Sequence, residues 1–101
     1  MQACSGSAEH ALLTQFFAAS RLRDLTALQQ IATTRFEPRE RGTVLDFKVV
    51  GVRHTSGDLK TATVDATVHL PSGEIASRRF DVTMRRVGGR WMVEAVADVN
   101  R

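Results

Sequence analysis

The sequence contains no tyrosine, one cysteine, two prolines, and no apolar run close to the ~20 residues that a membrane-spanning helix needs. A single cysteine excludes an internal disulfide. The three histidines, His10, His54 and His69, have no metal-ligand spacing, and the cysteine lies near the chain start, so we expect no metal site. Since neither a phosphate-binding loop nor a Ser-His-Asp arrangement occurs, we also expect no cofactor.

Length and composition indicate one ordinary globular domain. The 101 residues are 43% hydrophobic and 25% charged, which suits a chain with a single core. We assign residues 1–6 to a flexible start and residues 7–101 to one domain. The net charge is +3, and twelve of the fourteen basic residues are arginine, but acids and bases are interspersed. This mixture argues against a dedicated nucleic-acid surface.

The cysteine is Cys4, in the opening segment MQACSGSAEH. A small residue, then cysteine, then Ser-Gly-Ser is similar to the mature start of a bacterial lipoprotein, in which this cysteine carries the lipid. The first expectation is therefore an exported protein, held at the membrane only by a lipid on Cys4. The alternative is a cytoplasmic protein with an incidental cysteine.

Apolar residues recur at helical spacing in the first third of the chain. The segment SAEHALLTQFFAASRLRD places Leu12, Leu13, Phe16 and Phe17 on one stripe, which predicts an amphipathic helix. DLTALQQIATT predicts a second, shorter helix with Asp24 as its N-cap. RFEPRERG, residues 35–42, is the predicted linker because its proline disfavours helix in the preceding residue.

Three turn signals divide the rest of the chain into four strands. These signals are TSGD at 55–58, PSG at 71–73 and GG at 88–89. Turn length fixes strand register, so we predict an antiparallel meander in which His54 pairs with Leu59, Leu70 with Glu74, and Val87 with Arg90. One face of this sheet is then mostly apolar and the other carries alternating charges. We predict an α+β fold with both helices packed on the apolar face of a curved four-stranded sheet.

This layout resembles the nuclear transport factor 2-like proteins, in the cystatin-like group that includes the polyketide cyclase (SnoaL-like) and ketosteroid isomerase-like families. The resemblance rests on FFAASRLRDLTALQQIAT as the paired helices and on the final GGRWMV strand. It covers nearly the whole chain, and the helix pair is similar to that of small secreted and lipoprotein members. It implies a cone-shaped sheet around the helices, often with a pocket in its mouth, and often a homodimer. The chain departs from larger relatives in having little between the second helix and the sheet.

The predicted inner face suggests a ligand pocket. Arg78 falls among apolar residues there, and its guanidinium could anchor a carboxylate or phosphate at the pocket mouth. Alternatively, Arg78 extends its charge out of the open end. The ligand would be small and either apolar or anionic, and the expected walls are Phe47, Val64, Phe80, Val82 and Trp91.

The predicted outer face suggests a homodimer. An apolar patch there is bordered by charges such as Lys48, Asp65 and Arg79, and such a patch is typical of association sites. The alternative is a solvated face with a few exposed valines. The residues expected at the dimer contact are Val50, Val52, Thr63, Met92 and Val96.

Three functions follow in order of preference. The first is a non-catalytic binding or interaction domain. The second is an enzyme of the cyclase or isomerase type, which is disfavoured because there is no tyrosine and no acid is expected to face inward. The third is a weak nucleic-acid binder, since arginines cluster at 35, 39 and 41 and at 85, 86 and 90, although few aromatics could stack on bases.

Overall fold

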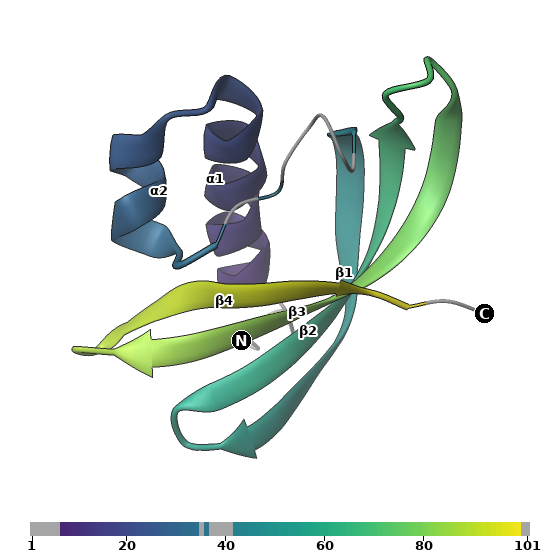
Figure 1. Cartoon of the computed structure of the whole chain (residues 1–101). Helices are drawn as coiled ribbons and strands as arrows, with labels where there is room; N and C mark the ends of the chain where they lie inside the picture. Colours follow the sequence, from purple (N-terminus) through teal and green to yellow (C-terminus); the bar gives the residue numbers. More distant parts are fainter. Residues whose placement is uncertain (1–6, 35, 37–41, 100–101) are drawn as a thin grey trace.

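A computed structural model describes residues 7–34, 36 and 42–99 and confirms the α+β architecture. Helices α1 (Ser7–Leu22) and α2 (Leu25–Ile31) precede four strands: β1 (Thr43–Ser56), β2 (Leu59–His69), β3 (Ile75–Val87) and β4 (Arg90–Asp98). The strands form one antiparallel sheet in the order β1-β2-β3-β4. Figure 1 shows both helices on the same side of a strongly twisted sheet.

The helix pair forms where the sequence predicts it. Between the helices, Arg23 adopts a positive φ of 57°, which breaks the helical path, and the Asp24 side chain accepts a hydrogen bond of 3.1 Å from the Ala27 amide. At the far end of α1, the buried Ser20 hydroxyl accepts a hydrogen bond of 3.0 Å from the Phe36 amide. This bond fixes Phe36 in the core. No helix within the described ranges is long and apolar enough to span a membrane.

The core lies between the helices and one face of the sheet. Phenylalanine rings form a continuous chain through it, with centroids 5.2 to 5.4 Å apart. The largest fully buried side chains are Phe16, Phe80, Leu13, Met84, Val64, Val68, Val82 and Val93. Each strand residue in that group alternates with an outward-facing neighbour, as a two-residue period requires.

Gly42 marks the entry into the sheet. Its φ is +87°, a conformation that side chains rarely adopt, and a Cβ at this position would collide with the carbonyl oxygen of His69. Only glycine fits such a close approach of two backbones. The chain therefore turns into β1 at the position where the sequence places the end of the linker.

Strand register is confirmed between β2 and β3 over their whole length, from Leu59↔Arg85 to His69↔Ile75. It is confirmed only in part for the outer strands, because both contain bulges. β1 shifts register between Val44 and Asp46, between Val49 and Gly51, and between His54 and Ser56, while β4 adds one residue opposite the Thr83–Met84 step. Each shift moves the following residues to the other face.

The bulges correct the predicted faces in a consistent direction. Val52 pairs with Ala62, and Val96 with Val82, so both valines pack against the core, and their predicted position on the outer face is wrong. A regular alternation along β4 would place Ala95 and Ala97 inside, but both are exposed. Without the β4 bulge, small alanines would fill the core positions and Val96 would face water. The bulge therefore increases the apolar volume that the sheet gives to the core.

Candidate functional site

Most of the predicted pocket walls are core residues. Val64 and Val82 are fully buried and Phe80 is 2% exposed. Phe47 is half-buried, with its ring stacked on His10 at 4.6 Å and edge-on to Phe17 at 5.2 Å. These contacts fill the space between the helices and this part of the sheet. The fifth predicted wall, Trp91, is half-buried nearer the turn that joins β3 to β4.

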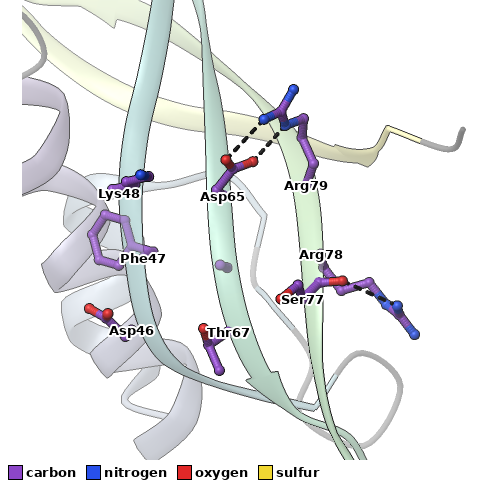
Figure 2. A pocket seen from close by; sticks show the side chains of 9 residues that line it. Asp46, Phe47, Lys48, Asp65, Thr67, Ser77, Arg78 and Arg79 are labelled. Carbon is purple, nitrogen blue, oxygen red and sulfur yellow. Dashed lines mark hydrogen bonds and ion pairs between the residues drawn. The ribbon is translucent and has the colours of Figure 1, made fainter.

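Arg78 is exposed and has a local partner. Its Nη1 donates a hydrogen bond of 3.4 Å to the carbonyl oxygen of Ser77, and its guanidinium extends away from Asp65 and Arg79 (Figure 2). It pairs with Ala66 across to β2, in the row that also contains Phe47. The charge therefore lies in water, outside the packed space between helices and sheet.

A buried ion pair joins α1 to β2. Lys60 Nζ lies 2.6 Å from Glu9 Oε2, and the two side chains are only 6% and 10% exposed. The same ammonium lies 4.0 Å from the centre of the Trp91 ring, and the Arg86 guanidinium lies 5.5 Å from the same ring centre. Arg86 in turn pairs with Asp58 at 2.9 Å. Glu9, Lys60, Arg86 and Asp58 thus form a charged cluster at the end of the core that lies next to the β1–β2 and β3–β4 turns.

The charge state of Glu9 follows from its surroundings. Burial acts to raise its pKa, but the hydrogen bond from Lys60, its own backbone amide and the nearby charges of Lys60 and His54 outweigh that effect. The pKa of Glu9 therefore lies below its ordinary value. Glu9 is an ionised carboxylate held by an ammonium, which makes it a poor proton acceptor.

Glu9 is an acid that the sequence pattern did not identify. The expectation that no acid faces inward is wrong, because Glu9 is buried against the sheet. A signal was available: Glu9 lies four residues before Leu13, on the same helical stripe, and Lys60 alternates with the apolar Ala62 and Val64. An acid and a base on facing apolar surfaces are each costly to bury alone, which predicts that they pair.

The outer face of the sheet carries a different kind of polar structure. Arg79 donates two hydrogen bonds to Asp65 on the neighbouring strand, and Thr63 donates one of 2.8 Å to Asp81. The arginine hydrogen bond lowers the pKa of Asp65, and Lys48 adds a smaller effect of the same sign. Beside these strands, nine residues line an open hollow of about 480 Å³ (Figure 2): Asp46, Phe47, Lys48, Asp65, Ala66, Thr67, Ser77, Arg78 and Arg79. Two of the predicted pocket residues, Phe47 and Arg78, are therefore among its lining.

The predicted dimer residues divide between the two faces. Thr63 and Met92 are half-buried and lie on the outer face, and Val50 is 45% exposed at a β1 bulge. Val52 and Val96 belong to the inner face, as the register shows. The outer face is therefore less apolar than the sequence suggests, with threonines, alanines and ion pairs in place of a valine patch.

Some predictions lie beyond the described residues. Cys4 and the linker arginines at 35, 39 and 41 fall outside them. Within residues 7–34, 36 and 42–99, no group of three His, Cys, Asp or Glu side chains is arranged to hold a metal. Comparison with protein-family models, with curated proteins and with solved structures finds no match to this chain.

Proposed function

We propose that this chain is a non-catalytic interaction domain that acts by pairing with a second copy of itself through its sheet. The observation that carries the proposal is the filled interior. The rings of Phe17, Phe36 and Phe80 contact one another in series at 5.3 Å, in the space between helices and sheet where the resemblance implies a pocket. The sheet, in contrast, has both helices of the described part of the chain on the same side (Figure 1).

We further propose that the fold is of the nuclear transport factor 2-like type. The element order supports this assignment, since two helices precede an antiparallel meander and pack on one of its faces. The long, bulged β1 also supports it, because bulges increase the curvature that a cone requires. A measured structure with an open, flat sheet would contradict the assignment.

The experiment that tests self-pairing is the molecular mass in solution. Multi-angle light scattering from about 10 µM to about 1 mM should show the mass rising from one chain towards two, because weak interfaces dissociate in this range. A mass of one chain at every concentration would contradict the proposal. Of the contact residues proposed from the sequence, Thr63, Met92 and Val50 remain candidates. Val52 and Val96 are excluded because they face the core.

An enzyme of the cyclase or isomerase type is the second candidate, favoured only by the buried Glu9. Such an enzyme needs a carboxylate whose pKa lies near the working pH and whose oxygen is free to take a proton. Glu9 has neither property, since Lys60 lies 2.6 Å from it and its pKa is lowered. NMR titration of the Glu9 carboxyl carbon tests this point: a midpoint above the ordinary glutamate value would revive the enzyme.

The proposed location rests on the sequence. We propose that Cys4 carries a lipid that holds the domain at a membrane surface. Intact-mass spectrometry of protein made in a bacterial host from the complete natural gene should find a diacylglyceryl adduct on this cysteine. An unmodified cysteine in that protein would contradict the anchor and favour the cytoplasm.

A further inference from the structure

β1 is an edge strand, so among residues 7–34, 36 and 42–99 one side of its backbone has no partner strand. Its residues 46–49 lie between two register shifts and pair regularly with β2. Leu45 just before this stretch is 54% exposed, and Val50 just after it is 45% exposed. Exposed apolar residues on an unpaired edge are a ready template for another strand.

The charges along this edge alternate in a self-complementary way. Asp46 and Lys48 project to the outer face on either side of Phe47, and both are exposed. Within the part of the chain that the structure describes, neither forms an ion pair or a side-chain hydrogen bond. A second copy of β1 could pair antiparallel with the first about a two-fold axis that passes between the two Phe47 residues. Asp46 of each chain would then lie opposite the partner's Lys48, which gives two such contacts.

The inner side of the same stretch also fits a symmetric contact. The two copies of Phe47 would meet at the axis, each ring already held from behind by its stack on His10. Leu45, at the bulge just before this stretch, would lie near the partner's Val49, so the contact covers an exposed apolar side chain. The bulges on both sides restrict the pairing to a few residues, so the contact is small and reversible.

We infer that the β1 edge is the self-association site, where residues 45–49 of two chains pair antiparallel about Phe47 and join the two sheets. This inference rests on the proposed function, because it names the surface through which the interaction domain pairs. The β1 edge fits a second copy better than the uncovered sheet face does. On that face, the acids Asp65 and Asp81 already have partners within the chain. On β1, Asp46 and Lys48 are exposed and form no ion pair among the described residues, so both can pair with a second copy.

The test uses charge reversal at the two positions in the full chain. Asp46→Lys places lysine against the partner's Lys48, and Lys48→Asp places aspartate against the partner's Asp46. Each variant alone should raise the dissociation constant about tenfold or more, because like charges then face each other twice. An equimolar mixture of the two variants should form a heterodimer, since every lysine then meets an aspartate. The double variant Asp46→Lys/Lys48→Asp should self-associate like the natural chain.

Arg90→Asp is the matched control, because it makes the same charge change as Lys48→Asp on the opposite edge strand and should leave the association unchanged. Native mass spectrometry identifies the heterodimer, and circular dichroism verifies that each variant is folded. A natural chain that dimerises equally in all variants would overturn the edge assignment and leave self-pairing intact. A mixture that stays monomeric while the natural chain dimerises would overturn it also. A natural chain that is monomeric throughout would overturn both proposals.

Discussion

Two ion pairs on β2 show how differently the faces of this sheet use charge. Lys60 and Asp65 lie five residues apart on the same strand and point to opposite faces. Lys60 is bound to Glu9 inside the core, with both side chains at most 10% exposed. Asp65 is bound to Arg79 on the outer face, where the side chains are 35% and 50% exposed.

This contrast distinguishes polar contacts that stabilise the fold from polar contacts that lie on the hydrated surface. A buried pair is isolated from water, so neither partner can lose the other without leaving an unsolvated charge. An exposed pair exchanges its partner for water at little cost, and salt screens it. The contrast can therefore be tested by removing one member of each pair from the same strand.

The largest effect is expected from Lys60→Met. The change leaves the Glu9 carboxylate buried without its ammonium and should destabilise the domain by about 3 to 5 kcal/mol. Urea unfolding followed by circular dichroism measures it. Asp65→Asn is the matched outer variant and should change the unfolding midpoint little.

The double variant Glu9→Leu/Lys60→Met separates the loss of a partner from the loss of packing. Its stability should return close to that of the natural chain, because an apolar pair of similar volume replaces both charges. If the double variant is as unstable as Lys60→Met, the ion pair itself is required and the comparison of the two faces fails.

A second comparison uses two neighbours on β4. Val96→Lys forces a charge towards the core and should cost about 1 to 3 kcal/mol, whereas Ala95→Lys projects into water and should cost little. Thermal unfolding of the two variants measures the difference. The opposite ranking would mean that β4 has no bulge and that Val96 lies outside, as the alternating sequence pattern alone suggests.

That ranking also marks how far the sequence predicts this fold. Both helices, the positions of the three turns and the full β2–β3 register could be predicted, because the periodicity and the turn residues are local signals. The predicted closing pair His54–Leu59 is wrong, since Leu59 pairs with Ser56. The bulges could not be predicted, because a strand sequence with one inserted residue is also compatible with a single unbroken register. For β4, the regular pattern gives Ala95 and Ala97 inside, and only packing against the helices favours Val96 there.

The candidate site was predicted less well for the same reason. The supposed pocket walls Val64, Phe80 and Val82 share an inner row, but a row of inward residues does not say whether a helix fills the space above it. Phe16 and Phe17 do fill it. The Glu9–Lys60 pair joins residues 51 positions apart, so no single local spacing reveals it. Only two patterns taken together, an acid on the apolar stripe of the helix and a lysine among inward strand residues, predict the contact.

The smallest effect is expected in the acid dependence of stability, which sharpens the comparison of the two ion pairs. The pKa of Glu9 is lowered in the folded chain, so its contribution is present above the ordinary glutamate pKa and is lost as the pH falls through the folded value. The same sign holds for Asp65, whose pKa Arg79 lowers. Unfolding midpoints in urea, measured from pH 7 down through the carboxylate range at about 4, should therefore fall for the natural chain.

Glu9→Gln and Asp65→Asn separate the two contributions. Each variant should show a flatter fall with pH, because one carboxylate no longer takes up a proton on unfolding. Salt at about 1 M should abolish the difference in pH dependence between Asp65→Asn and the natural chain, because salt ions screen exposed charges over about 3 Å. The difference between Glu9→Gln and the natural chain should persist, because Glu9 and Lys60 are shielded from those ions by the core and by Trp91. Equal loss of both differences in salt would show that the inner pair is as open to solvent as the outer one.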